Sequence, residues 1–342
     1  MAIRFVVSIE DKAYFHWQLS IFLESLVNQL PEGSGIDVVV CNDYAPLSPD
    51  LATVFTTYGD VVRYLPGTNY GRRRIEVQSE DDAVSYRVGA SASHAYLDVQ
   101  WRTSPRSYIA LNRVEALNVV GDSLASDMIV LMDPDIFLYG QLNPSLLPDR
   151  NSLQENTSIG DTPFFRRGED GRGVLLPELL RALQCEHPYK PGGVTVFLDA
   201  ETVRNKKFIG DCFRFAQLLY LAGQIVFGER EGPERAWVSE MACFSLALTV
   251  NGIPYQVLEY REFSTWIFDE SIPSGTFYHY YASDSGGRGF GAFPGSPWDK
   301  KQHYSENLLR TADLVALQQN AVTDHERVFF GLAKSAKTRL GW

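Results

Sequence analysis

Residues 128–135 read MIVLMDPD: five apolar residues lead without a break into two aspartates that flank Pro134. A continuous apolar run of this length is typical of a strand that is buried on both faces, as in a parallel sheet. Ligands of open α/β sheets bind outside the carboxyl ends of such strands. This strand is therefore expected to deliver Asp133 and Asp135 to a ligand-binding edge, with Pro134 stiffening the turn between them.

The same alternation of strand and helix begins at the N-terminus. Residues 3–8 form an apolar run, and apolar residues then recur at helical spacing from Phe15 to Leu30. Further strands are expected at residues 36–41 and 60–65. Together with the central strand, this order predicts an α/β fold with a parallel sheet covered by helices.

The rest of the chain continues this pattern less regularly. Residues 70–82 and 151–173 are polar and predict loops, and residues 285–298 are too rich in glycine and proline for regular structure. The other expected elements are helices at 112–124, 177–185, 211–227, 239–250 and 306–320, strands at 194–198 and 255–258, and a basic tail to residue 342.

Composition narrows the class of protein. The chain has 342 residues, 45% of them hydrophobic, which is enough for a substantial core. A net charge of −11 does not favour nucleic acid as a partner. The four cysteines form no CxxC pair, and no apolar stretch is long enough for a membrane span. These features predict a cytoplasmic protein without a zinc site built from cysteine.

An Asp-x-Asp pair is a weak signal alone, because two acids in a surface turn give the same pattern. Here Asp133 and Asp135 close a buried strand at the ligand-binding edge. Clustered carboxylate oxygens with open coordination positions suit Mg²⁺ or Mn²⁺ bridging a nucleotide diphosphate.

Several blocks of the sequence resemble one enzyme family. IVLMDPDIFLYG (129–140) is preceded by FVVSIEDKAYFHWQ (5–18) and YIALNRVEALN (108–118). It is followed by PGGVTVFLD (191–199), WVSEMACFSLA (237–247), TFYHYY (276–281) and WDKKQHY (298–304). In this order the blocks resemble nucleotide-sugar glycosyltransferases of the GT-A fold, and most closely the hydroxyproline O-arabinosyltransferase and peptidyl-serine galactosyltransferase group.

The resemblance implies one catalytic domain over residues 1–342, an α/β fold with a Rossmann-like mixed sheet flanked by helices. Its nucleotide-sugar-binding half would be residues 1–140, its acceptor-binding half and lid residues 141–305, and residues 306–342 a C-terminal helix and tail. The donor would be a UDP-sugar, carrying a pentose such as arabinose, or galactose. The acceptor would be a hydroxyl of a peptide, a protein or a small molecule.

The resemblance also implies a third metal ligand and a catalytic base. His279 lies among aromatic residues and is read either as a buried core histidine or, from the family, as a ligand beside Asp133 and Asp135. Glu240 opens an apolar helix, where an acid favours the helix dipole. In the family reading it takes the acceptor proton in an inverting transfer.

Donor-binding residues are expected around these groups, each with an ordinary structural alternative. Arg113 is expected on the diphosphate and Asn112 on the base or ribose, unless the two only begin a solvated helix. The remaining candidates are Ser8 and Glu10 beside uracil and ribose, Pro134 in the metal turn, and Gly192 and Gly193 at a close approach to the sugar.

Residues 285–298 are expected to form a lid over the donor. Arg288, Lys300 and Lys301 would then balance the charge of the departing diphosphate, unless they serve only solubility. Three alternatives remain open: a retaining transferase on the same fold, a nucleotidyltransferase, and a non-catalytic carbohydrate-binding protein. The segment after the first strand has no glycine-rich phosphate loop, which disfavours the nucleotidyltransferase.

Overall fold

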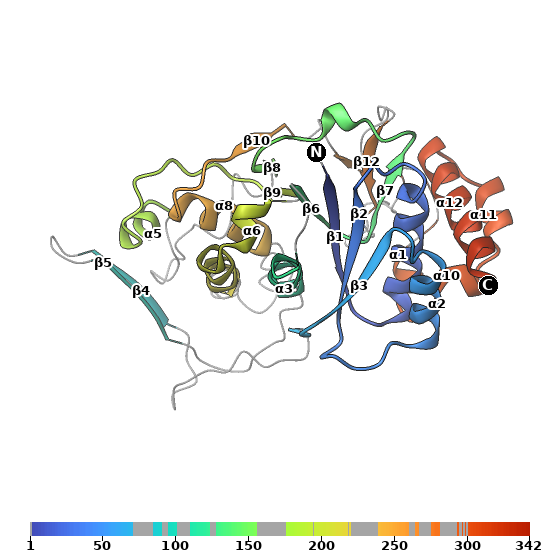
Figure 1. Cartoon of the computed structure of the whole chain (residues 1–342), viewed down its shortest axis with the longest axis horizontal. Helices are drawn as coiled ribbons and strands as arrows, with labels where there is room; N and C mark the ends of the chain where they lie inside the picture. Colours follow the sequence, from blue (N-terminus) through green and yellow to red (C-terminus); the bar gives the residue numbers. More distant parts are fainter. Residues whose placement is uncertain are drawn as a thin grey trace. The chain divides into compact units, whose positions relative to one another are not determined.

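The computed structural model forms two compact units, and each unit is assembled from separate segments of the chain (Figure 1). The first contains residues 1–67, 126–149 and 259–342, and the second contains residues 68–125 and 150–258. The residues that the structure describes are 2–70, 85–90, 95–100, 110–123, 128–155, 176–193, 195–217, 219, 239–259, 264–266, 275–280, 293, 296, 298 and 300–342.

The first unit is built on four parallel strands. They are β1 (Ile3–Ile9), β2 (Gly35–Cys41), β3 (Val62–Gly67) and β6 (Met128–Met132), and they pair in the order β6-β1-β2-β3. Because all four run the same way, their carboxyl ends meet at one edge. The predicted α/β class and the strand that carries the Asp-x-Asp pair are confirmed.

Three helices cover one side of these strands (Figure 1). They are α1 (Ala13–Leu26), α2 (Pro49–Thr57) and α12 (Asp324–Leu340), which contact one another. The helix expected after the first strand is confirmed as α1, which buries a wide apolar face. The prediction did not include α2, whose start is fixed by Ser48, because its hydroxyl accepts a hydrogen bond from the Leu51 amide.

The prediction of a C-terminal tail is wrong. After the short helices α10 (Leu308–Thr311) and α11 (Leu314–Gln319), the chain forms the long helix α12. Thr323 caps its first turn and Gly341 ends it in the left-handed conformation. The basic residues that suggested a tail alternate with a buried stripe: Phe329, Phe330, Ala333, Ala336 and Leu340.

A second, smaller sheet in the first unit holds the aromatic segment. Strand β12 (Thr276–His279) pairs antiparallel with β7 (Ile136–Tyr139) and parallel with β11 (Ser264–Trp266). Buried rings from these strands, and from residues that follow β12, meet rings from α1 and α12. The cluster consists of Trp17, Phe137, Tyr278, Tyr280, Phe293, Trp298 and Phe329.

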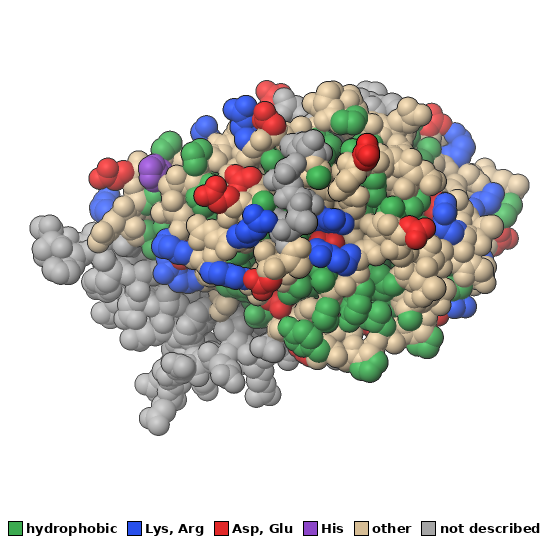
Figure 2. Space-filling model, viewed as in Figure 1, with side chains coloured by type: hydrophobic (Ala, Val, Ile, Leu, Met, Phe, Trp, Pro, Cys, Tyr) green, Lys and Arg blue, Asp and Glu red, His purple; other side chains and the backbone are tan. Residues whose placement is uncertain are grey.

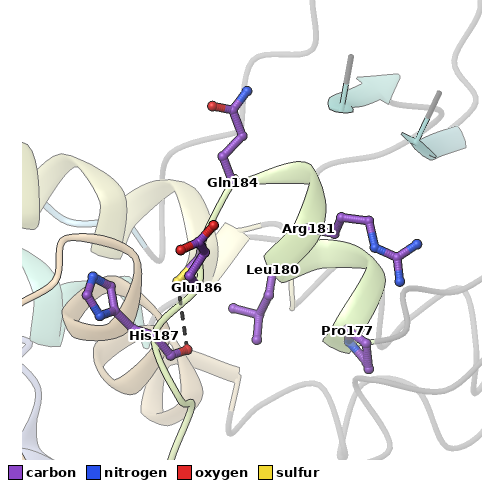
Figure 3. Close-up of a pocket in the computed structure, with 7 residues that line it drawn as sticks. Pro177, Leu180, Arg181, Gln184, Glu186 and His187 are labelled. Carbon is purple, nitrogen blue, oxygen red and sulfur yellow. Dashed lines mark hydrogen bonds between the residues drawn. The ribbon is translucent and has the colours of Figure 1, made fainter. Parts of the chain in front are cut away.

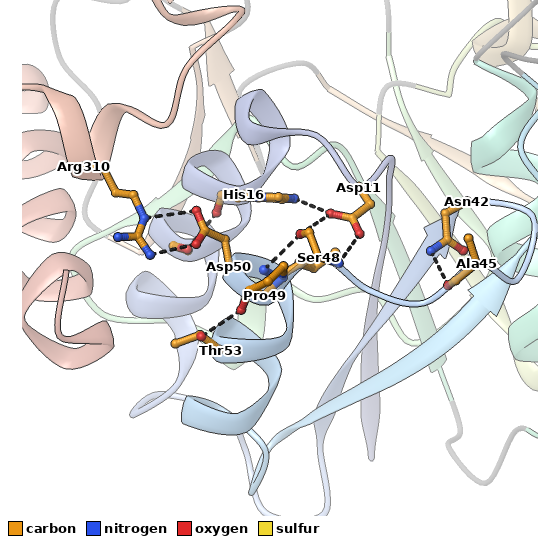
Figure 4. A network of polar contacts seen from close by, with 11 residues as sticks. Asp11, His16, Asn42, Ala45, Ser48, Pro49, Asp50, Thr53 and Arg310 are labelled. Atoms are coloured by element: carbon orange, nitrogen blue, oxygen red, sulfur yellow. Dashed lines mark hydrogen bonds and ion pairs between the residues drawn. The ribbon is translucent and has the colours of Figure 1, made fainter.

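A polar network ties the starts of α1 and α2 together beside the carboxyl ends of β1 and β2 (Figure 4). Asp11 accepts hydrogen bonds from the Ser48 amide at 2.7 Å and the Ser48 hydroxyl at 2.6 Å, and His16 Nε2 lies 2.7 Å from the same carboxylate. Arg310 forms two hydrogen bonds with Asp50, at 2.7 and 3.0 Å. The network fixes the backbone that borders the ligand-binding edge.

The second unit contains its own strands and helices. Strand β8 (Ser152–Gln154) pairs parallel with β10 (Gln256–Leu258) and antiparallel with β9 (Val196–Asp199), and β4 (Ser85–Ala90) pairs antiparallel with β5 (Ala95–Gln100). The helices are α3 (Leu111–Gly121), α5 (Leu176–Ala182), α6 (Ala200–Arg204) and α8 (Ser239–Val250), and residues 206–217 are also helical. These elements confirm the helices expected to begin near residues 112, 177 and 239 and the strands expected near 194 and 255. The helix expected at 211–227 begins earlier, at residue 206, and its last part lies outside the described residues. The prediction of a loop over residues 151–173 is wrong at its start, because residues 152–154 are buried and pair with two strands as β8.

Acidic and basic side chains are interspersed on the face shown in Figure 2. Among the described residues, none of the helices has both the length and the apolar character needed to cross a membrane.

Candidate active site

Three of the predicted residues come together in the first unit. Asp133, Asp135 and His279 each place one ligand atom within 4.8 Å of the others. His279 Nε2 lies 3.1 Å from an oxygen of Asp135 and 3.9 Å from an oxygen of Asp133. Two carboxylates and an imidazole within this distance form a donor set that suits Mn²⁺ or Mg²⁺.

Strand pairing explains how residues far apart in sequence reach the same place. Asp133 follows directly on β6, and Asp135 lies immediately before β7. In the antiparallel pair of β7 and β12, His279 lies opposite Ile136, the residue after Asp135. The Tyr280 amide then donates a hydrogen bond to the Asp135 carbonyl at 3.1 Å, so the backbone fixes the histidine beside the aspartates.

Lys300 also reaches this cluster. Its ammonium donates a hydrogen bond to Oδ2 of Asp135 at 2.5 Å, and only 3% of the residue is exposed. Burial by itself raises the pKa of the Asp135 carboxyl, but the Lys300 ammonium and the His279 imidazole outweigh burial and hold this pKa well below its usual range. Asp135 is therefore ionised at neutral pH, as a metal ligand must be.

The other residues predicted in this unit border the cluster. Pro134 is buried between the two aspartates, and Ser8 is partly buried near the end of β1. Glu10 is 3% exposed and accepts a hydrogen bond from the Lys12 ammonium at 2.6 Å. Parallel register places Ser8 level with Asp133, because Val7 pairs with Met132. Their assignment to donor binding stays a prediction.

Glu240 lies in the second unit, in the first turn of α8, as predicted. Arg113 donates a hydrogen bond to its carboxylate at 3.2 Å, and both residues are at least 95% buried. Arg113 also lies over the Phe244 ring, with 5.8 Å from its guanidinium carbon to the ring centroid. The sequence did not predict this ion pair, because the partners are 127 residues apart.

Of the two glycines predicted at the sugar, Gly193 lies against the start of the same helix and Gly192 lies against β8. Gly193 has a φ of +141°, and a Cβ there would lie 2.1 Å from the Met241 carbonyl oxygen. A Cβ on Gly192 would lie 2.8 Å from the Leu153 Cβ. Both positions therefore require glycine for backbone packing, whether or not a sugar approaches them.

Asn112 and its neighbour Glu115 hold the backbone that follows residue 67. The Asn112 side-chain oxygen accepts a hydrogen bond from the Tyr70 amide at 2.9 Å, and Glu115 accepts one from the Thr68 amide at 3.1 Å. Asn112 was predicted on the base or ribose, and this contact shows that it also orders its own surroundings. The start of α3 is buried rather than solvated.

The remaining predictions fall largely outside the described residues. Arg288 and most of the segment 285–298 lie there, as does the side chain of Lys301.

A pocket in the second unit contains none of the predicted residues (Figure 3). It is lined by Pro177, Leu180, Arg181, Gln184, Cys185, Glu186 and His187. Most of these side chains are exposed, and the Cys185 thiol donates to the Thr249 carbonyl at 3.5 Å. This pocket combines charged and apolar groups, but its described lining holds no cluster suited to a metal or to acid–base chemistry.

Comparisons with known proteins add a structural similarity only. No protein-family model and no curated protein sequence matches the chain. The galactosyltransferase LgtC, solved with donor and acceptor sugar analogs, is similar over 97% of this chain and 95% of its own, with 11% identity and a TM-score of 0.49. A structure of an active-site mutant of LgtC gives the same values.

The bifunctional glycosyltransferase WbbM, solved without ligand, is similar over 97% of this chain and 51% of its own, with 11% identity and a TM-score of 0.46. Similarities of this degree do not carry a functional conclusion, which has to come from the site itself.

Proposed function

We propose that this protein is a metal-dependent glycosyltransferase of the GT-A type that takes its sugar from a UDP-sugar. The observation that supports this most is the cluster of Asp133, Asp135 and His279 at the carboxyl edge of a parallel sheet. The edge is where α/β folds bind nucleotides. Its two carboxylates are ligands of the kind that hold a divalent ion on a diphosphate.

The three residues would hold Mn²⁺ or Mg²⁺. When bound, the ion would neutralise the charge that grows on the departing diphosphate. Asp133 and Asp135 supply carboxylate oxygens, and His279, fixed by the pairing of β12 with β7, supplies a nitrogen. Ser8 and Glu10, which end the neighbouring strand, are proposed to contact the nucleoside.

For the chemical step we propose an inverting transfer with Glu240 as the base. A carboxylate removes the proton of the acceptor hydroxyl as the oxygen attacks the anomeric carbon from the face opposite the diphosphate. The buried Arg113, which donates a hydrogen bond to this carboxylate, would orient it. Asn112, Gly192 and Gly193 are proposed to lie along the donor.

The finer assignment rests on the sequence resemblance. We propose a donor that carries arabinose or galactose and an acceptor hydroxyl on a peptide, a protein or a small molecule. A single domain and a cytoplasmic location likewise remain predictions.

One observation favours a second candidate, a retaining transfer on the same fold. Glu240 is only 2% exposed and is engaged by Arg113, which also suits a purely structural ion pair. A retaining enzyme would not need Glu240 as a base.

A thermal-shift panel tests the proposed function. Purified protein is heated with UDP, UDP-galactose, UDP-arabinose and control nucleotides, with Mn²⁺ or with EDTA. A ligand that binds only the folded state stabilises the protein, by about 2.7 kcal/mol when its free concentration is one hundred times its Kd. This gain in stability raises the melting temperature. We expect a shift with uridine nucleotides that needs Mn²⁺, and the absence of any such shift would contradict the proposal.

A further inference from the structure

Both carboxylate oxygens of Asp135 are already engaged by side chains of the protein. Oδ1 lies 3.1 Å from His279 Nε2, and Oδ2 accepts the 2.5 Å hydrogen bond from the Lys300 ammonium. A divalent ion that uses Asp135 therefore meets a cation that already occupies one of its two oxygens.

Two aromatic rings flank the Lys300 ammonium and help to hold it in place. It lies 5.3 Å from the centroid of the Tyr280 ring and 5.7 Å from that of Tyr14, distances at which a ring face attracts a cation. Burial raises the pKa of both tyrosine hydroxyls, so the two rings remain uncharged. Lysine is rarely buried to this degree unless it is paired.

Lys300 and a divalent ion would compete for this carboxylate. Two like charges within a few ångströms in a partly buried site repel strongly, because little solvent separates them. The lysine ammonium can move away from the carboxylate, since it is a point charge on a flexible four-carbon stem. An anion close to the site would offer the ammonium another partner.

We propose that Lys300 is an internal counter-ion that competes with the divalent metal for Asp135. When a nucleotide diphosphate binds, the Lys300 ammonium leaves the Asp135 carboxylate and contacts the diphosphate instead. The inference rests on the proposed function, because it concerns the same metal cluster. In this arrangement metal binding depends on the nucleotide. Without a diphosphate, Lys300 lowers the affinity for the metal; with a diphosphate, Lys300 contacts it and raises the affinity for metal and nucleotide together. Lys300 is thus a positioning residue rather than only a contact for the leaving group.

The test measures Mn²⁺ binding directly, by the paramagnetic resonance signal of the free ion. Wild type and Lys300→Met are titrated with Mn²⁺, without nucleotide and with saturating UDP. Without nucleotide, the variant should bind Mn²⁺ about ten- to a hundredfold more tightly, the range set by one hydrogen bond to a charged group. With UDP this advantage should vanish or reverse, because the variant has no ammonium for the diphosphate.

Two further variants serve as a control and as a substitute for Lys300→Met. Lys334→Met is the matched control, because Lys334 contacts Gln318 on the neighbouring helix α11 and should bind Mn²⁺ as wild type does. Lys300→Gln keeps a polar side chain and serves if Lys300→Met does not fold, as judged by melting.

The outcomes separate the two proposals. If wild type binds Mn²⁺ with UDP but loss of the Lys300 ammonium gives no gain without UDP, the counter-ion role is overturned and the metal site stands. If neither protein binds Mn²⁺ under any condition, the proposed metal site itself is wrong.

Discussion

Replacing Glu240 by Gln distinguishes a catalytic base from a buried structural carboxylate. Glutamine keeps the shape of the side chain and an oxygen that can still accept the hydrogen bond from Arg113, 3.2 Å away in the wild type. It removes the charge and the ability to take a proton. The structure around the site should therefore persist while the proposed chemistry is lost.

The two readings predict effects of different size. Removing the carboxylate charge leaves the buried Arg113 guanidinium without a counter-charge, which should cost about 3–5 kcal/mol of stability. If Glu240 is the base, turnover should also fall by roughly 10²- to 10⁴-fold, while the affinity for the UDP-sugar stays near that of the wild type. If Glu240 is only structural, turnover should change little once the protein is folded.

The assay follows release of UDP during transfer, with donor affinity measured separately by calorimetry. Glu115→Gln is the matched control, because Glu115 is a buried carboxylate of α3 in the same unit that accepts a hydrogen bond from the Thr68 amide. The control should lose stability but keep its turnover. Near-normal turnover of Glu240→Gln would refute the inverting mechanism and support the retaining alternative.

Four further outcomes are expected. Asp133→Asn or Asp135→Asn should abolish the metal dependence of UDP binding in calorimetry without unfolding the protein, and unchanged metal dependence in both would contradict the assignment. His279→Ala should weaken Mn²⁺ binding in the presence of UDP, whereas a lower melting temperature with unaltered metal affinity would indicate a core histidine. Phe329→Ala should lower the free energy of unfolding by about 3–5 kcal/mol in urea titrations, since the ring is fully buried; a loss below about 1 kcal/mol would argue against the packing of α12. Burial lowers the pKa of His16 from 6.5, so the unfolded chain takes up a proton that the folded protein resists, and stability should fall as the pH drops below about 6.5. His16→Asn should lose less stability than wild type between pH 7.5 and 5.5, and an equal loss would exclude this cause.

The local pattern was sufficient to predict the elements that carry the metal cluster. The strand at 128–132 has the predicted bounds, because an unbroken apolar run ending in Asp-x-Asp has few other readings. The helix after the first strand was likewise predicted from the spacing of its apolar residues. His279, in contrast, joined the prediction only through the family resemblance.

Other features depend on contacts that a local pattern does not contain. Helix α12 was predicted to be a tail because Lys334, Lys337 and Arg339 lie between the buried apolar residues that pack on α1, and they obscure the helical spacing of those residues. Lys300 was expected on a diphosphate, and its pairing with Asp135 joins residues 165 positions apart. The rings of Tyr14 and Tyr280 around it were not predicted, because only the fold brings them to the same ammonium.

The most direct test of the proposed function is turnover of a UDP-sugar. UDP-galactose and UDP-arabinose are incubated with the protein and candidate hydroxyl acceptors, and UDP and the glycosylated product are measured by mass spectrometry. We expect UDP release that requires Mn²⁺ or Mg²⁺, stops with EDTA and is lost in Asp135→Asn. UDP release that continues unchanged in EDTA, or in Asp135→Asn, would contradict a metal-dependent transferase built on Asp133, Asp135 and His279.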